Sequence, residues 1–572
     1  MRPRVWAPRA DRVELVLADG GRVELEPRDG GWFEGGPELG HGDRYGYALD
    51  GGPPLPDPRS RWQPDGVHGL SAVDDPETHH WTDDEWTGLE RLGGTIYELH
   101  VGTFTPEGTL DAAIDRLDHL VDLGVSAVEL LPVAEAMGER GWGYDGVDLW
   151  AVHHAYGGPA ALRRFVDAAH RAGIGVLLDV VYNHLGPEGA YLDRFGPYFI
   201  DDHSTPWGPG VNLDGPGSTE VRRFIVDNGV HWCAEHHIDG LRIDATHHLR
   251  DRGPTHVVAE LVAALDVVGR GDGRRRWTIV EREQAELLPL RAPEHGGWGV
   301  DARWGDDLHH ALHAHLTGER DGYYAPFGAL ADVATVLRRG HLPPGEALTP
   351  DVAPERLVTC SQNHDQIGNR PGGERLHHLA GIRPAMAAAA VVILGPGTPL
   401  LFQGEEWAAT SRFPFFCDTQ DADLADRIRA GRHAELEPLG WSPDDIDDPL
   451  DPSVFAAARL DWDEPARPPH REVHDWYRAL VHLRRSESGL GATEVSVEVD
   501  EGARTLVMRR GRLALLVNLA EVEAALPVQG DLVVANGPVD ERAGATVLSP
   551  GCTAVLRLPS TATRCGGRRS LD

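Results

Sequence analysis

Cysteine is scarce in this chain, and long apolar runs are absent. The N-terminal segment "MRPRVWAPRADRVELVL" lacks the apolar core of a signal peptide, and no stretch reaches the roughly 18 apolar residues of a membrane span. The cysteines are scattered and contain no Cys-x-x-Cys pair, which argues against a disulfide framework or a cysteine-based zinc site. They are Cys233, Cys360, Cys417, Cys552 and Cys565. We therefore expect a protein of the reducing cytoplasm, with no membrane segment.

Basic residues are outnumbered. The chain has 54 Lys and Arg against 90 Asp and Glu, which gives a formal net charge of −36 at pH 7. This balance argues against nucleic acid or an anionic membrane as partner. It fits a neutral small molecule or a sugar, although a solvated acidic surface is the commoner explanation. The Gly-x-Ser-x-Gly motif of esterases is also missing, which argues against that class.

The order of strand-like and helix-like segments predicts a multidomain fold over the 572 residues. Residues 1–90 hold short alternating strands with a hairpin turn at Gly20-Gly21, and they predict an immunoglobulin-like β-sandwich resembling carbohydrate-binding modules. In residues 91–488 apolar strands alternate with amphipathic helices, which predicts a central (β/α)8 TIM barrel with insertions. Residues 489–560 predict a second all-β domain, a C-terminal β-sandwich, and residues 561–572 a disordered tail.

Polar side chains stand where the predicted barrel strands end. The third strand, "IGVLLDVVYNH", carries Asp179, Asn183 and His184, and the fourth, "IDGLRIDAT", carries Arg242 and Asp244. An arginine and an aspartate two residues apart lie on one face of a strand. Charges are seldom buried in such a strand unless they are paired or functional.

Three carboxylates end three different strands: Asp244, Glu281 in "TIVERE", and Asp365 in "SQNHDQIGN". Because the active site of such a barrel lies at these strand ends, we expect the three to face one pocket. Glycoside hydrolysis needs one ionised carboxylate and one protonated carboxyl. Arg242 would keep Asp244 ionised by charge pairing, a drier wall would keep Glu281 protonated, and Asp179 would orient Arg242.

Each of these features alone has a purely structural explanation. An Arg-x-Asp pair is more often a buried ion pair, Asp179 can be structural, and "QNHDQIGN" can be a capped turn. Their joint occurrence in this order, each at a strand end, favours catalysis.

The segments "DVVYNH", "GLRIDATHH", "IVERE" and "SQNHDQIGN" resemble the four signature regions of the α-amylase superfamily, glycoside hydrolase family 13. The resemblance implies a retaining hydrolase with Asp244 as nucleophile and Glu281 as general acid/base. It implies that Asp365 stabilises the transition state and that His184 and His364 hydrogen-bond the sugar.

Other segments, among them "DPRSRWQPDGVHG", "GWGYDGV", "PWGPGVNLDG" and "DDLHHALHAHLTGE", are similar to one branch of that superfamily. That branch hydrolyses the α-1,4 bond next to the terminal trehalose of a trehalose-capped maltooligosaccharide. It needs no cofactor and acts after the synthase that makes the cap. By this resemblance Tyr144 stacks under the sugar at the cleavage position, and Trp207 is an aromatic wall at the trehalose end, although a lone tryptophan can equally be core packing.

The resemblance also implies a wider set of residues around the substrate. Asp179 and Asn183 would support the site, and the further substrate-binding residues would be Arg242, Ile243, Ala245, Thr246, His247, Asp306, Asp307, His309, His310, His364, Gln366, Ile367, Gly368 and Asn369. His309 and His313 have a spacing that can bind metal, but no third ligand follows, so we expect none.

Two positions depart from the superfamily pattern. Arg282 stands where an acidic residue is usual, and Cys417 and Thr419 flank Asp418 where threonine and histidine are usual. The subsite roles there stay open. The alternatives are a glycogen branching or debranching enzyme of the same superfamily and a non-catalytic glucan-binding barrel, which would usually lose one of the three carboxylates.

Overall fold

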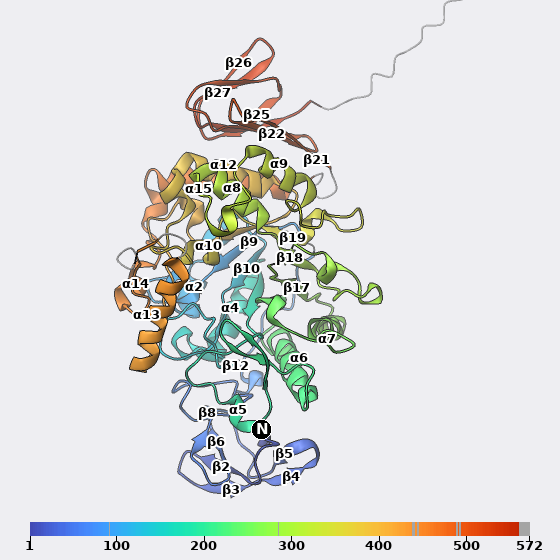
Figure 1. The fold of residues 1–572 in the computed structure, drawn as a ribbon, viewed down its shortest axis with the longest axis vertical. Helices are drawn as coiled ribbons and strands as arrows, with labels where there is room; N and C mark the ends of the chain where they lie inside the picture. Colours follow the sequence, from blue (N-terminus) through green and yellow to red (C-terminus); the bar gives the residue numbers. More distant parts are fainter. Residues whose placement is uncertain are drawn as a thin grey trace, which may run out of the picture.

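The computed structural model describes residues 1–90, 92–283, 285–437, 441–442, 446–487, 490 and 494–559. Antiparallel sheets stand at the N-terminal and C-terminal ends of an elongated molecule, with a closed barrel between them (Figure 1). The predicted fold class, a central (β/α)8 barrel flanked by β-structure, is confirmed. The predicted tail at 561–572 lies outside the described residues.

Two antiparallel sheets form the N-terminal part, in the orders β1-β5-β4 and β3-β2-β6-β7, with β8 against β6. The hairpin predicted at Gly20-Gly21 is present, because β2 pairs with β3, and Gly20 adopts φ 83°, which favours glycine. The strands are β1 (Arg4–Trp6), β2 (Val13–Leu17), β3 (Arg22–Glu24), β4 (Glu26–Arg28), β5 (Trp32–Glu34), β6 (Arg44–Leu49), β7 (Pro54–Leu55) and β8 (Ser71–Ala72).

Parallel strands close the barrel in the order β10-β13-β16-β17-β18-β19-β20-β9. Every residue of these strands is buried, because helices cover the outside and side chains fill the inside, which explains their near-continuous apolar sequences. Their bounds are β9 (Ile96–Leu99), β10 (Ala127–Leu130), β13 (Gly175–Val180), β16 (Gly240–Ile243), β17 (Trp277–Val280), β18 (Ala302–Trp304), β19 (Leu357–Thr359) and β20 (Thr398–Phe402).

The longer helices between and after these strands are α4 (Gly158–Arg171), α6 (Ser218–Glu235), α7 (Val257–Asp272), α8 (Asp307–Thr317), α9 (Leu330–Arg339), α12 (Ile382–Leu394), α13 (Ala422–Leu436) and α15 (His470–Ser486). Two pairs of antiparallel strands lie in the segments that follow barrel strands. After β10, β11 (Ala134–Glu135) pairs with β12 (Asp148–Val152). After β13, β14 (Phe199–Thr205) pairs with β15 (Gly208–Val211). Within the described ranges, every helix is too short or too polar to span a membrane.

The C-terminal part holds two further antiparallel sheets, in the orders β21-β22-β23-β28-β25 and β24-β27-β26. Its strands are β21 (Val495–Asp500), β22 (Thr505–Arg510), β23 (Leu513–Asn518), β24 (Ala524–Leu526), β25 (Asp531–Ala535), β26 (Val539–Arg542), β27 (Ala545–Leu548) and β28 (Thr553–Arg557). Arg510 of β22 donates to the carbonyl of Leu394 at the end of α12 at 3.3 Å, which ties this part to the barrel.

A buried ion pair joins the N-terminal part to the barrel. Arg163 of α4 donates to Asp74, just after β8, and both side chains are 1% exposed. Charges taken out of water need such a partner. On the surface nearby, Arg164 and Asp111 make a similar pair with side chains 48% and 51% exposed.

We predict that Asp74→Ala lowers the free energy of unfolding by about 3–5 kcal/mol, because it leaves the Arg163 charge buried and unpaired. Asp111→Ala is the matched control and should cost less than about 1 kcal/mol, since the exposed pair is screened by solvent. Urea denaturation of both variants measures the difference. Equal effects of the two substitutions would contradict the assignment.

Candidate active site

Arg242 lies in β16, fully buried, and its guanidinium contacts three carboxyl groups. Nη1 donates to Oδ2 of Asp179 and to Oδ1 of Asp244, each at 2.7 Å, and Nη2 donates to Oε2 of Glu281 at 2.9 Å. The guanidinium carbon lies 4.0 Å from the ring centroid of Trp304. A single cation therefore joins residues from the C-terminal ends of β13, β16 and β17.

The sequence of β16 explains this placement. Arg242 pairs with Asp179 in the β13–β16 ladder, so both side chains point into the barrel. Leu241 and Ile243 alternate with Arg242 and join the hydrophobic core. The two-residue spacing then places Asp244 on the same inner side as Arg242, just beyond the strand.

Asp244 has the surroundings of an ionised carboxylate. Asn183 donates to its Oδ2 at 2.9 Å, and Arg242 donates to its Oδ1. Burial raises the pKa of Asp244, but the charges of Arg242 and His184 and the hydrogen bond from Asn183 outweigh burial and lower it below its ordinary value. The side chain is still 10% exposed, so a small molecule can reach it.

Glu281 has the opposite balance. Burial is the largest influence and raises the pKa of Glu281 well above its ordinary value, and the negative charges of Asp244 and Asp365 act in the same direction. Arg242 and the backbone N–H of Ala245, which donates at 2.9 Å, oppose this shift. Two carboxyls on one guanidinium thus differ in protonation, the division of roles that acid-assisted nucleophilic displacement needs.

A chain of hydrogen bonds connects Glu98 of β9 to Arg242, the partner of Asp244 and Glu281. Nδ1 of His364 donates to Oε1 of Glu98 at 2.6 Å, and Nε2 lies 2.8 Å from the hydroxyl of Tyr144. That hydroxyl donates to Oδ2 of Asp179 at 2.6 Å, and Asp179 accepts from Arg242. The Tyr144 oxygen therefore accepts from His364, which uses both ring N–H groups.

The surroundings of His364 favour its charged form. Burial lowers the pKa of His364, but the negative charges of Glu98 and Asp365 outweigh burial and raise it to about 9. Oδ1 of Asp365 lies 3.5 Å from Nε2 of His364, and the side chain of Asp365 is 36% exposed. A fixed imidazolium thus lies beside the most open of the three carboxylates.

Asp306 follows β18 and lies close enough to the site for Asp365 to influence it. Burial, aided by the charge of Asp365, raises the pKa of Asp306 to about 6, against the charges of Arg303 and Arg242. Asp306, Asp365 and the Arg242 cluster therefore occupy one end of the barrel.

Tyr144 depends on a glycine for its position. Gly143 adopts φ 102°, and a Cβ there would meet the carbonyl oxygen of Pro132 at 2.2 Å. Only glycine allows this close approach, which sets Trp142 and Tyr144 against His364, at ring-centroid distances of 5.5 and 5.1 Å.

Trp207, in the turn between β14 and β15, is 50% exposed and stacks on His184 with ring centroids 4.4 Å apart. His184 also makes a 3.0 Å hydrogen bond with the carbonyl of Tyr144 and influences the pKa of Asp244. An exposed indole beside a buried histidine of the site is a suitable platform for the apolar face of a sugar.

Three of the predicted substrate-binding side chains are deeply buried. Ile243 and Ile367 are 0% and 1% exposed and lie in hydrophobic clusters. His309 is 1% exposed, and its ring nitrogens bond to the carbonyl of Ser361 and the hydroxyl of Tyr324. Their place near the substrate, which the superfamily resemblance implies, stays a prediction.

The remaining predicted contacts differ in their surroundings. Thr246, Gln366 and Gly368 are buried. The hydroxyl of Thr246 donates to the Glu281 carbonyl at 2.6 Å, and the side chain of Gln366 accepts from the backbone of Asn363. At Gly368 a Cβ would collide with Trp142. Asp307 accepts from the backbone of Leu342 at 2.6 Å. His247 and His310 are half-buried, and Asn369 is exposed.

The two departures from the superfamily pattern have local partners. Arg282 forms an ion pair at 2.9 Å with Glu286, four residues further along the chain. Asp418 accepts from Arg140 at 2.8 Å, and Thr419 donates to Glu188 at 2.6 Å.

Sequence reasoning missed two glutamates under the site. Glu98 and Glu129 are direct partners in the β9–β10 ladder, and both are 1% exposed. Burial raises the pKa of Glu129 well above its ordinary value, as does the charge of Glu98, and among the described residues neither Glu129 oxygen has a hydrogen-bond partner. Glu98 is a charged residue inside the apolar strand "IYEL", just as Arg242 is inside "GLRI", and the sequence could have indicated it in the same way.

The family described as "Alpha amylase, catalytic domain" matches residues 72–202. The malto-oligosyltrehalose trehalohydrolase of Arthrobacter ramosus is 46% identical over 97% of this chain and 99% of its own length. That of Rhizobium sp. strain M-11 is 44% identical over 97% of each chain. The crystal structure of a candidate α-amylase from Salmonella typhimurium has a TM-score of 0.88 and 34% identity, over 98% of this chain and 97% of the other.

We predict that Glu98→Gln makes catalysis more sensitive to alkali. Without the Glu98 charge, burial dominates and the pKa of His364 falls from about 9, so the imidazolium present in the parent at pH 8 is lost in the variant. The ratio of variant to parent kcat/KM for α-glucoside hydrolysis should therefore drop roughly tenfold between pH 5.5 and pH 8.

Glu129→Gln is the control, because it exchanges a neutral carboxyl for a neutral amide at the neighbouring ladder position. Its pH profile should match that of the parent. Parallel profiles for both variants would show that Glu98 does not set the charge of His364.

Proposed function

This chain belongs to the malto-oligosyltrehalose trehalohydrolases, glycoside hydrolases of the α-amylase family, and on that basis we propose the bond that it cleaves. The substrate is a maltooligosaccharide capped by trehalose, and the bond is the α-1,4-glucosidic bond next to the terminal trehalose. Hydrolysis releases trehalose and a shortened maltooligosaccharide.

The proposed reaction is a double displacement. Asp244 attacks the anomeric carbon, and Glu281 donates its proton to the departing glycosidic oxygen, so that trehalose leaves as Asp244 forms a glucosyl ester. Glu281, now ionised, takes a proton from water, and that water breaks the ester from the opposite face. Two inversions give net retention of the anomeric configuration.

One observation supports this division of roles most directly: Arg242 donates to Asp244 and to Glu281 through its two terminal nitrogens. Asp244 has further donors that favour its charge, whereas burial keeps the proton on Glu281. When Glu281 loses its proton, Arg242 already lies beside it and stabilises the carboxylate that must act as base.

The remaining groups of the site act on the sugar. Asp365, the most open carboxylate, would stabilise the positive charge that develops at the anomeric centre. The imidazolium of His364 can donate to a sugar hydroxyl only by exchanging its bond to Tyr144, and the ring of Tyr144 would support the sugar face. Trp207 would form the wall at the trehalose end, a role that its exposure and its stacking on His184 support.

The proposal also implies a partner reaction and a compartment. A synthase must first convert the reducing end of a maltooligosaccharide into a trehalose cap. A cytoplasmic location is supported by the unpaired state of all four described cysteines, which suits a reducing environment.

Maltotriosyltrehalose and maltopentaose test the specificity, because both contain five glucose units and only the first has a trehalose end. We expect release of trehalose from maltotriosyltrehalose with a kcat/KM at least about tenfold higher than for cleavage of maltopentaose, since a site with polar groups fitted to the cap discriminates against substrates without it. Chromatography of the products measures both rates, and Glu281→Gln should abolish both.

Other outcomes would identify the alternatives. Equal attack on both substrates would contradict the trehalohydrolase specificity, and transfer of glucan chains without trehalose release would indicate a branching enzyme. Glucan binding without turnover by the parent would indicate a non-catalytic barrel.

A further inference from the structure

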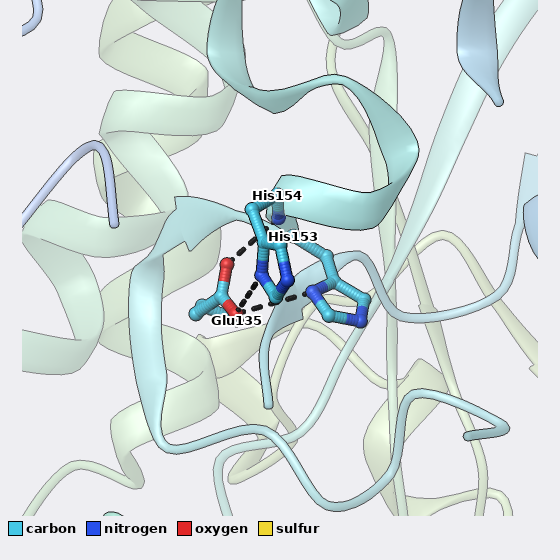
Figure 2. A group of neighbouring side chains, drawn as sticks. All are labelled: Glu135, His153 and His154. Carbon is cyan, nitrogen blue, oxygen red and sulfur yellow. Dashed lines mark hydrogen bonds and ion pairs between the residues drawn. The ribbon is translucent and has the colours of Figure 1, made fainter. Parts of the chain in front are cut away.

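A second cluster of ligand-type side chains lies where β11 and β12 meet (Figure 2). Glu135 ends β11, and His153 and His154 directly follow β12. One side-chain ligand atom from each residue lies within 4.8 Å of the others. The sequence alone does not reveal this cluster, because strand pairing is what brings Glu135 to the two histidines.

Glu135 is the centre of the cluster. Its Oε1 lies 3.2 Å from Nδ1 of His153 and 2.6 Å from Nδ1 of His154, and its Oε2 accepts from the backbone N–H of His154 at 2.8 Å. The Glu135 side chain is fully buried, that of His153 is 7% exposed and that of His154 is 27% exposed. The cluster is therefore closed on the Glu135 side and open to solvent at His154.

We propose that Glu135, His153 and His154 bind one divalent transition-metal ion of the zinc class. Two imidazole nitrogens and one carboxylate oxygen suit Zn²⁺ or Co²⁺, whereas Ca²⁺ and Mg²⁺ prefer an all-oxygen set. Three protein ligands leave a fourth position for water, and the opening at His154 provides both that position and an entry path.

The two distances from Glu135 to the histidine nitrogens are compatible with such an ion after a small adjustment. Ligands about 2.0–2.2 Å from a tetrahedral ion lie roughly 3.3 Å from one another. The 3.2 Å separation of His153 and Glu135 already matches this value. The 2.6 Å separation at His154 must widen, which its partly exposed ring permits.

A neighbouring acid gives independent support. Asp148 is the partner of Glu135 in the β11–β12 pairing, next to a shift in register, so the two residues are neighbours across the strands. Asp148 is 5% exposed, and among the described residues its Oδ2 has no hydrogen-bond partner. Burial and the charge of Glu135 raise its pKa well above the ordinary value. A divalent cation at Glu135 would therefore favour the ionised form of a neighbouring acid that burial otherwise keeps neutral.

The position of the cluster suggests what the ion would do. Residues 136–147 connect β11 to β12 and include Trp142 and Tyr144, which lie against His364. An ion bound at Glu135, His153 and His154 would hold the two ends of this segment together. We therefore expect metal binding to stabilise the fold without supplying a catalytic group.

Titration of the chelator-treated full chain with Co²⁺ tests the proposal directly. We expect one equivalent to produce the visible absorption of four- or five-coordinate Co²⁺, displaced by one equivalent of Zn²⁺. Binding should be lost at low pH, because the histidine nitrogens must release their protons to bind metal. Glu135→Gln and His154→Gln should each weaken binding at least about tenfold.

The adjacent histidines His79 and His80 provide the matched control, since His80 is exposed and, among the residues that the structure describes, the pair forms no such cluster with a carboxylate. The double substitution to glutamine should leave the Co²⁺ spectrum and stoichiometry unchanged. Because His154 is partly exposed, we expect His154→Gln to fold normally. Circular dichroism checks the folding of this variant and of Glu135→Gln. Absence of the Co²⁺ band, or an equal loss in the control, would overturn the proposal.

Discussion

The active site depends on Arg242, a cation with no contact to solvent and three carboxyl partners. Removing a guanidinium from water is costly, and only close carboxylates compensate for it. One positive charge cannot balance three negative ones, so the partners differ in protonation according to their other neighbours. The amide of Asn183 and the nearby His184 help to lower the pKa of Asp244, whereas burial and two further acids raise the pKa of Glu281. The assignment of nucleophile and acid follows from this difference.

Barrel closure makes that arrangement possible. Glu98, Asp179, Arg242 and Glu281 come from or directly follow β9, β13, β16 and β17, and the parallel register places their side chains within one continuous hydrogen-bonded chain. The chain passes through His364 and Tyr144, so that a charge on β9 influences two groups that we propose act on the sugar. The excursion between β10 and α4 supplies Tyr144, and it also contains the proposed metal ligands.

Much of this could be predicted from sequence, for identifiable reasons. Parallel strands buried on both faces leave long apolar runs, so a charged residue such as Arg242 or Asp179 within one was conspicuous. Strand β18 was not conspicuous in the sequence, because its three residues, "ARW", are too few to show a pattern. Glu98 was overlooked although "IYEL" has the same form, and Trp304 could not be found because only the register places it under Arg242. The roles predicted for Ile243, Ile367 and His309 rest on the resemblance alone, because their side chains are buried.

In the proposed mechanism, Arg242 holds Asp244 as the charged nucleophile while Glu281 carries the proton. Incubation of Glu281→Gln with α-maltosyl fluoride, whose leaving group needs no acid, tests this claim most directly. The first displacement should proceed and the second should stall, because the variant has no base to activate water. Peptide mass mapping should then locate one maltosyl group on Asp244. A label on any other residue, or turnover with no trapped ester, would contradict the account.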